Sequence, residues 1–193
     1  MKKLPSYLES PIDNGIYYII EKIAPSVYSM GFTPNMITTL GNVCTLIFIY
    51  FFIQKRFYLS ALFFFLSYMF DCLDGYLARS YNMTTEFGDL YDHTSDLLKT
   101  LSYIYLLFTT NRQIFFKILP IILVSMVLTF IHFAHQEIYY GKPGDSITLQ
   151  LFTMFSLAKT KEEAEQYLPL TRYFGCGSTI LLMTIIIIMY KTK

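Results

Sequence analysis

Residues 71–96 read DCLDGYLARSYNMTTEFGDLYDHTSD, and they contain two pairs of aspartates, each spanning one helical turn. Asp71 precedes Asp74 by three residues. Asp92 precedes Asp96 by four, so each pair lies on one face of a helix. Apolar segments flank the stretch, which places the carboxylates at or inside a membrane boundary. A buried aspartate costs about 2.5–3.5 kcal/mol at the centre of a membrane helix, so four of them indicate neutralising cations.

The four carboxylates predict a divalent-metal site. Oxygen ligands one turn apart on facing helices suit hard ions such as Mg²⁺ or Mn²⁺. The flanking apolar segments run through the membrane in opposite directions, so the two pairs can face each other across antiparallel helices. Asp89, near a helix start, is better explained as a partner of the helix dipole. Lys99 could pair with a carboxylate or contact a substrate phosphate, and we favour pairing.

Written as a pattern, the stretch is D-x-x-D-G-x-x-A-R-x8-G-x3-D-x3-D, with every position filled. It resembles the signature of the CDP-alcohol phosphotransferases (class I of the CDP-alcohol phosphatidyltransferases), membrane enzymes of phospholipid head-group synthesis. The resemblance is strongest over residues 34–98. It implies that an acceptor hydroxyl cleaves a CDP-linked donor and releases CMP. Displacement at a phosphorus of the donor's pyrophosphate requires that the charge of the leaving group be neutralised and that a base be positioned. Metals and carboxylates supply both.

The resemblance also implies roles for individual residues. Two divalent ions, Mg²⁺ or Mn²⁺, are expected at the four acids Asp71, Asp74, Asp92 and Asp96. Asp96 is in addition the expected general base. The CDP-linked donor is expected to contact Asn35, Thr38, Asp74, Gly75, Ala78, Arg79, Thr85 and Gly88.

Some of these donor contacts carry a specific expectation. Gly75 and Ala78 would leave room for the nucleotide against their helix. Arg79 and Thr85 would contact donor phosphate, and Gly88 would permit a turn and a close approach into the next helix. Asn35 and Thr38 belong to a Pro-Asn-x-x-Thr run that resembles the start of the family's first transmembrane helix. Simple helix capping by Thr33 is the alternative explanation of that run.

Composition narrows the class of protein. Of the 193 residues, 54% are hydrophobic and 15% are charged, against about 25% charged in an average soluble domain. The formal net charge of +1 provides no basic footprint, so nucleic acid is excluded as an expected partner. The three cysteines form no C-x-x-C pair and are interpreted as buried thiols, not as a disulfide framework or a zinc site.

The apolar pattern predicts the membrane topology. Residues 1–33 are expected to form an interfacial segment, with an amphipathic helix that Ser10 caps and that Pro25 kinks or ends. Residues 34–193 are expected to form the transmembrane domain. Its spans of roughly 20 residues are predicted at 34–53, 57–79, 89–109, 114–139 and 173–190.

The fold prediction is an all-α polytopic membrane bundle of five to six transmembrane helices after the surface helix. The family core has six, and residues 147–158, followed by a charged patch at 160–166, could supply the sixth. Gly175 and Gly177 are expected to allow close helix approach. His132 and His135 could bind a metal, line an acceptor pocket or pack at the interface, and packing is favoured.

The predicted function is transfer of a phosphatidyl group from a CDP-linked lipid, CDP-diacylglycerol by similarity in chain length, to a small polar alcohol. The alternative is an aminoalcohol phosphotransferase that uses CDP-choline or CDP-ethanolamine with diacylglycerol, because Tyr91-Asp92-His93 resembles the Asp-His pair of those enzymes. An intramembrane prenyltransferase and a cation transporter are further alternatives. A transporter would explain the carboxylates, but it would not require Gly75 or Arg79. The resemblance implies a homodimer, and the active site is expected on the cytoplasmic side.

Overall fold

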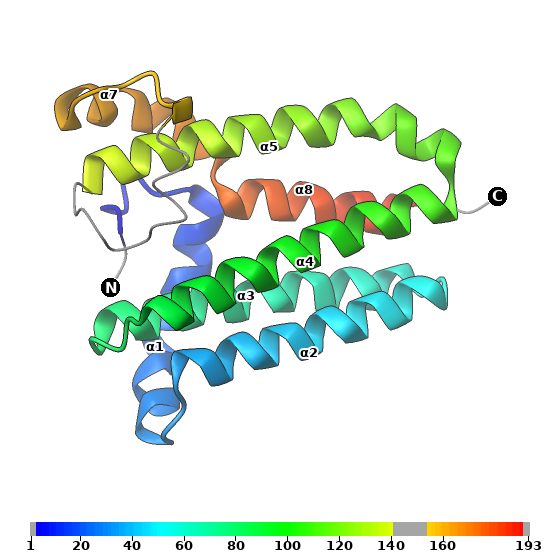
Figure 1. Ribbon diagram of the computed structural model, residues 1–193, viewed down its shortest axis with the longest axis horizontal. Helices are drawn as coiled ribbons and strands as arrows, with labels where there is room; N and C mark the ends of the chain where they lie inside the picture. The colour runs from blue at the N-terminus through cyan, green and yellow to red at the C-terminus, as the bar shows by residue number, and fades with distance from the viewer. Residues whose placement is uncertain (1–2, 141–153, 191–193) are drawn as a thin grey trace.

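The computed structural model describes residues 3–140 and 154–190, and within these ranges every regular element is a helix. Figure 1 shows the long helices running along one axis, with both α1 and α7 at one end. The predicted all-α polytopic bundle is confirmed. In chain order the elements are α1 (Pro11–Ser29), α2 (Pro34–Ile53), α3 (Phe57–Ser80), α4 (Glu86–Thr110), α5 (Arg112–Tyr140), α7 (Lys161–Thr171), the 3₁₀-helix η2 (Arg172–Phe174) and α8 (Cys176–Met189).

Four of the described stretches are long and apolar enough to cross a membrane: Pro34–Ile53, Phe57–Ser80, Arg112–Tyr140 and Lys161–Met189. They correspond to α2, α3, α5 and the run from α7 to α8. The predicted span at 89–109 is not among them, although α4 has 25 residues and packs against α2 and α5. The chain is therefore a multi-pass membrane protein in which α4 is the most polar of the long helices in the bundle.

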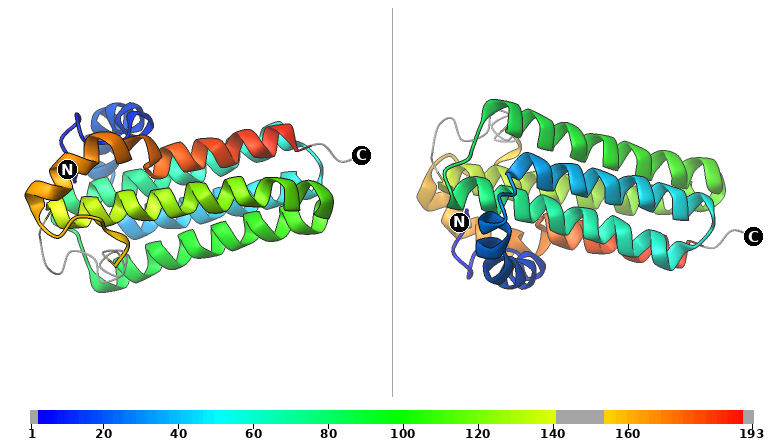
Figure 2. Two further views of the ribbon diagram at one scale, coloured as in Figure 1. Left: turned by 90° about the horizontal axis from the view of Figure 1, so that it is seen from above. Right: turned by 90° about the horizontal axis from the view of Figure 1, so that it is seen from below.

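α1 lies crosswise at the end of the bundle (Figures 1 and 2). It begins where predicted, because Ser10 Oγ accepts a hydrogen bond from the Asp13 amide and Pro11 takes the first helical position. Pro25 does not end it, because the helix continues to Ser29. Ile16, Ile20 and Ala24 are buried, whereas Ile23 is exposed together with Glu21 and Lys22. An interfacial position of the helix stays a prediction.

Among the helices that the structure describes, α2 and α3 pack against each other most extensively. Phe48 of α2, Phe64 of α3 and Tyr103 of α4 are buried there. The ring centroids of Phe48 and Phe64 lie 5.1 Å apart, and those of Phe64 and Tyr103 lie 5.3 Å apart. This packing brings the end of α3 and the start of α4 to the same end of the bundle as α1 (Figure 1).

The last predicted span, 173–190, is not continuous. η2 ends at Phe174, and α8 has only 14 residues, from Cys176 to Met189. The turn and the first residues of α8 face the start of α1: a Cβ at Gly175 would lie 2.7 Å from Ser10 Cβ, and one at Gly177 would collide with Asp13 Oδ1. The two glycines thus allow the close approach that was predicted, and the element that approaches is α1.

The region before α8 is described in part. Most of the segment 147–158, which could have supplied a sixth span, lies outside the described residues. The charged patch at 160–166 is the first part of α7, where Thr160 Oγ1 accepts a hydrogen bond from the Glu163 amide at 3.2 Å. α7 packs against α5.

Candidate functional site

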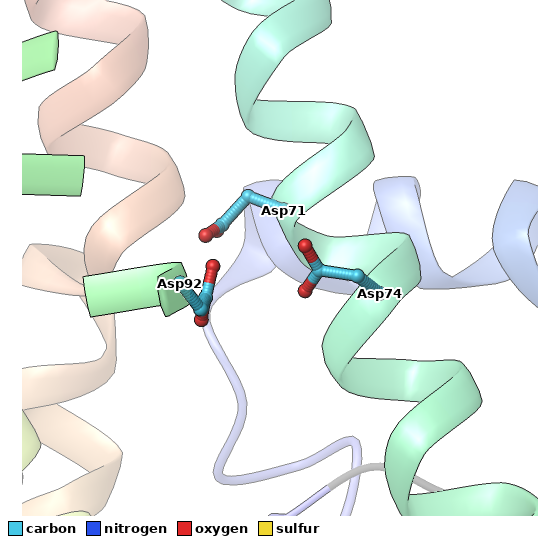
Figure 3. A group of neighbouring side chains, drawn as sticks. All are labelled: Asp71, Asp74 and Asp92. Atoms are coloured by element: carbon cyan, nitrogen blue, oxygen red, sulfur yellow. The ribbon is translucent and has the colours of Figure 1, made fainter. Parts of the chain in front are cut away.

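Three aspartate side chains converge between α3 and α4 (Figure 3). Asp71 and Asp74 come from α3 and Asp92 from α4, and one carboxylate oxygen of each lies within 4.8 Å of those of the other two. Asp74 is 3% exposed, and the other two are half-buried. The spacing of three residues puts Asp71 and Asp74 on one face of α3, and helix packing brings Asp92 opposite them.

These three side chains, called here the Asp triad, are positioned for a metal ion. Carboxylate oxygens that lie this close together in little-exposed side chains repel one another when all three groups are ionised. A bound cation removes that electrostatic penalty. Because the donors of the triad are all oxygens, they fit a hard divalent ion better than a thiophilic one. The triad could bind a cation that also binds a phosphate, and the cation would neutralise the charge of the carboxylates.

Thr38 of α2 orients one member of the triad. Its Oγ1 lies 2.6 Å from Asp74 Oδ2, and the Thr38 side chain is buried. Thr33 caps the same helix, because its Oγ1 accepts a hydrogen bond from the Met36 amide at 3.3 Å. The capping explanation of the Pro-Asn-x-x-Thr run is therefore confirmed. A nucleotide contact by Asn35 or Thr38 stays a prediction.

The fourth aspartate behaves differently from the triad. Asp96 Oδ1 lies 2.7 Å from Lys99 Nζ, one turn further along α4. Pairing, the role favoured for Lys99, is what the structure has. Asp96 nevertheless lines the same small cavity as the triad, between α2, α3 and α4. Its roles as metal ligand and as general base stay predictions.

One cleft beside the triad brings together all the residues for which a donor contact was predicted. They come from α2, from the end of α3 and from the start of α4, so segments more than 50 residues apart form one surface. Lys3, Asp92 and His93 also line this cleft. Its predicted members are Asn35, Thr38, Asp74, Gly75, Ala78, Arg79, Thr85 and Gly88.

Two glycines in the cleft have identifiable neighbours. A Cβ at Gly75 would lie 3.0 Å from Arg79 Nη1, so Gly75 leaves room for the guanidinium to fold back along α3. Gly88 is inside the first turn of α4, not in a turn before it as predicted, because Thr85 caps the helix and accepts from the Gly88 amide at 3.0 Å. A Cβ at Gly88 would lie 3.1 Å from Asn35 Oδ1, so the predicted close approach is present.

An amide clamp that the sequence analysis missed holds α4 against α2. Asn42 Nδ2 donates to Tyr91 Oη at 3.1 Å and to Ser95 Oγ at 2.9 Å. Tyr91 and Ser95 directly precede Asp92 and Asp96 in the chain. The signal that could have revealed this clamp is Asn42 itself, an amide within the apolar span 34–53, two helical turns after Asn35.

The histidines divide between two locations. His93 lines the cleft, and its Nε2 lies 3.3 Å from Asp89 Oδ1 one turn earlier. His132 and His135 instead pack against α7: His132 Nδ1 lies 3.3 Å from Thr171 Oγ1, and the His135 ring stacks on Tyr167. The favoured interpretation of His132 and His135, packing, therefore agrees with their contacts.

Asp13 joins α1 to the rest of the site. Its carboxylate accepts hydrogen bonds from Tyr68 Oη of α3 at 2.6 Å and from the Gly177 amide of α8 at 3.2 Å. Burial raises the pKa of Asp13, and the hydrogen bonds from Tyr68 and Gly177 oppose that shift. Tyr68 is one helical turn before Asp71 on α3, so the contact with α1 is made one turn away from the triad.

Comparison with known proteins agrees with this geometry. Residues 32–191 match the CDP-alcohol phosphatidyltransferase family. This chain belongs to that family. The match includes the Asp triad and every predicted donor-contact residue of the cleft, so the resemblance seen in residues 71–96 extends over most of the chain.

Among relatives of this CDP-alcohol phosphatidyltransferase family member is the archaetidylinositol phosphate synthase of Pyrococcus horikoshii, which is 33% identical over 86 residues. The aligned part covers 45% of this chain and 46% of the relative, so the chain matches about half the length of that protein. No solved structure is significantly similar to this chain.

Proposed function

We propose that this chain is an integral membrane transferase that moves a phosphatidyl group from CDP-diacylglycerol to the hydroxyl of a small polar alcohol and releases CMP. The observation that supports it most directly is the cleft that ends at the Asp triad and gathers the predicted donor-contact residues. Membership of the CDP-alcohol phosphatidyltransferase family supports the reaction class. The name of the Pyrococcus relative favours a polyol or polyol phosphate as the acceptor.

The proposed reaction is a single displacement at phosphorus. Arg79 and Thr85 hold the donor phosphates, and Gly75 and Ala78 leave room for the nucleotide. Asp96 accepts the proton of the acceptor hydroxyl. As the proton leaves, the hydroxyl oxygen bonds to the lipid-linked phosphorus, and the bond from that phosphorus to CMP breaks. Two divalent ions, Mg²⁺ or Mn²⁺, held by the Asp triad with Asp96, would neutralise charge on the leaving phosphate.

A second candidate is transfer of phosphocholine or phosphoethanolamine from its CDP ester to diacylglycerol. The observation in its favour is that His93 lines the cleft directly after Asp92 and pairs with Asp89, so an imidazole is close to the candidate metal ligands. In that reaction His93, instead of Asp96, would accept the proton of the acceptor hydroxyl.

Purified protein in vesicles should decide between the two candidates. CDP-diacylglycerol, CDP-choline and CDP-ethanolamine are offered in turn with radiolabelled acceptors, and CMP is measured by chromatography. We expect CMP release with CDP-diacylglycerol and a radiolabelled lipid product with a polyol, a polyol phosphate or serine. Release only with an aminoalcohol donor and diacylglycerol would select the second candidate.

Metal dependence tests the mechanism separately from the substrate. Treatment with a chelator should abolish CMP release, and Mg²⁺ or Mn²⁺ should restore it. Turnover that survives chelation would exclude the two-metal mechanism. Protein that releases no CMP from any donor, yet carries divalent cations across vesicles, would support a transporter instead.

The remaining expectations concern the assembly. We propose a homodimer, an interfacial segment at 1–33 ahead of the transmembrane domain at 34–193, and a cleft that faces the cytoplasm. Native mass spectrometry from detergent measures the oligomeric state. The orientation is measured by labelling a cysteine placed at exposed Glu86, the residue after Thr85 of the cleft, in intact cells and in inverted vesicles.

A further inference from the structure

Lys3 brings a positive charge to the cleft beside the Asp triad from a part of the chain that has no assigned donor contact. Of the described residues that line this cleft, Lys3 alone precedes α1. The others lie between Pro34 and His93, on α2, α3, α4 and the turn that joins the last two. All eight predicted donor-contact residues belong to that second group. One wall of the cleft therefore has no assigned role, and it carries an ammonium.

The segment ahead of α1 is held in place by packing and by hydrogen bonds. Leu4 and Leu8 are buried and form a small apolar cluster with Leu168 of α7. Arg172 Nη1, at the start of η2, donates to the Tyr7 carbonyl. The segment is thus part of the folded bundle, and Lys3 has a defined position in the wall of the cleft.

Glu137 of α5 positions the Lys3 side chain. Lys3 Nζ lies 2.8 Å from Glu137 Oε1, and the two side chains are 11% and 8% exposed. Charged groups that are so little exposed are costly unless they are paired, so this contact fixes both side chains. An ammonium has three N–H donors, and Glu137 accepts from one of them. Lys3 can therefore keep the ion pair and still donate to a ligand in the cleft.

The other basic side chains of the cleft belong to its α3–α4 side. Arg79 folds back along α3, where the proposed function assigns it to donor phosphate. His93 Nε2 lies 3.3 Å from Asp89 Oδ1 on its own helix. The carboxylates of the cleft repel any second substrate that carries a phosphate, and Lys3 offsets that repulsion at the wall that the donor does not use.

We propose that Lys3 binds the phosphate of a phosphorylated acceptor, and that it makes the enzyme select a polyol phosphate over the same polyol without phosphate. This inference rests on the proposed function, in which the second substrate is a small polar alcohol. A lysine ammonium is a compact charge with rotatable donors, which suits the oxygens of a phosphate monoester. The phosphates of the CDP-linked donor offer the same chemistry, so the experiments distinguish the two substrates.

Steady-state kinetics with paired acceptors provide the first test. Inositol and glycerol are each offered with and without a phosphate, at saturating CDP-diacylglycerol. We expect wild type to have the higher kcat/KM for the phosphorylated member of a pair. Lys3→Met should raise the KM of that acceptor about 10–100-fold, the effect of losing a hydrogen bond between charged groups, and should leave donor KM near wild type. Preference of wild type for acceptors without phosphate would overturn the inference, and so would a rise in donor KM instead of acceptor KM.

Variants of Glu137 separate phosphate binding from a structural role of the ion pair. Glu137→Gln breaks the pair but leaves the ammonium in the cleft, so the KM of the phosphorylated acceptor should not rise. A rise equal to that of Lys3→Met would show that Lys3 only fastens the segment ahead of α1 to α5. Lys3→Met combined with Glu137→Gln leaves no unpaired carboxylate, and its acceptor KM should stay as high as in Lys3→Met alone. Lys22→Met, a change at an exposed lysine of α1 outside the cleft, is the control for net charge and should match wild type.

Calorimetric binding of inositol phosphate and of glycerol phosphate, with Mg²⁺ and CDP present, gives a readout without turnover. Wild type and Glu137→Gln should bind at least one of them with similar affinity, and Lys3→Met should bind it about tenfold more weakly or worse. Equal binding by wild type and Lys3→Met would overturn the inference, and so would the absence of binding to wild type. If wild type released no CMP from any donor, the proposed function would fail, and this comparison would still decide whether Lys3 binds a phosphate.

Discussion

Buried polar groups join helices in two parts of the bundle, and they differ in kind. Between α2, α3 and α4 the polar residues are four aspartates, a lysine and the Asn42 clamp, gathered around a cleft. Between α5 and α8 they are hydroxyls: Thr179 Oγ1 lies 2.7 Å from Ser125 Oγ and 2.6 Å from Thr129 Oγ1.

The hydroxyl cluster satisfies itself, whereas the acidic cluster does not. Ser125 and Thr179 sit in the wall of a largely apolar groove beside Val124, Leu128 and Leu182, and their bonds to each other leave little for a ligand to satisfy. The Asp triad carries excess negative charge that its neighbours only partly offset. In a membrane protein, unbalanced charge is the better marker of a functional site than polarity alone.

Asp96→Asn and Asp71→Asn should have the largest effects and should divide the acidic cluster itself. Asp96→Asn should lower kcat about 10²–10⁴-fold, the usual contribution of a general base, while metal-dependent donor binding persists. Asp71→Asn should instead weaken that binding, because it removes a negative oxygen from the triad. A titration of CDP-donor at fixed Mg²⁺ beside turnover measures both. Equal loss of donor binding would make Asp96 a metal ligand first, with His93 the next candidate base.

Arg79→Lys should have the next largest effect. The change keeps the charge and loses the planar fork that binds phosphate through two hydrogen bonds. We expect donor KM to rise about tenfold, corresponding to roughly 1.4 kcal/mol, with acceptor KM less affected. Steady-state kinetics with each substrate varied in turn provide the measurement. An unchanged donor KM in folded protein would leave Arg79 as a counter-ion for the carboxylates.

Asp13→Ala tests the joint between the two parts, since Asp13 binds α3 and α8 at once. Leaving Tyr68 Oη and the Gly177 amide without an acceptor should lower the free energy of unfolding by about 1–3 kcal/mol. Asp13→Asn, which keeps an acceptor oxygen, is the matched control and should lose less. Because burial raises the pKa of Asp13, its contribution declines as pH rises through that pKa, so wild type should lose stability relative to Asp13→Asn. Thermal unfolding in detergent at several pH values would show this, and a pH-independent difference would contradict it.

Ser125→Ala should have the smallest effect and completes the comparison. It removes one hydroxyl from the self-satisfied cluster between α5 and α8, and such interhelical bonds contribute about 0.6 kcal/mol on average. We expect turnover within a factor of about two of wild type. A loss as large as that of Arg79→Lys would mean that the apolar groove takes part in substrate binding.

Local signals predicted most of the acidic part. The caps at Ser10 and Thr33 gave the starts of α1 and α2 because capping is a contact between near neighbours in the chain. The spacing of Asp71, Asp74 and Asp92 predicted their convergence because helical period and antiparallel packing leave few other arrangements. The eight donor-contact residues came from the family resemblance, and the cleft gathers them all.

Contacts between distant segments explain what the sequence did not reveal. The run 173–190 carries no charge and was predicted as one span, with Gly175 and Gly177 interpreted as sites of close helix approach. The break before α8 falls at Gly175, where the chain meets Ser10 ahead of α1. Asn42 is visible as an amide within an apolar span, but its partners Tyr91 and Ser95 belong to α4 and cannot be identified from the sequence of α2 alone. Pro25 remains inside α1 because a helix that packs against α3 and α8 can tolerate one missing amide donor.

The depth of the Asp triad determines in which phase the concentration of each substrate matters. Asp74 precedes the end of α3 by six residues, which is about 9 Å along the helix axis. A head group can reach this depth while its acyl chains stay in the bilayer, and a polar acceptor arrives from bulk water. For the proposed reaction, the donor concentration that matters is its mole fraction among the lipids. Adding inert lipid at constant total donor should slow turnover, whereas diluting the whole vesicle suspension at fixed acceptor concentration should leave the turnover of each enzyme unchanged.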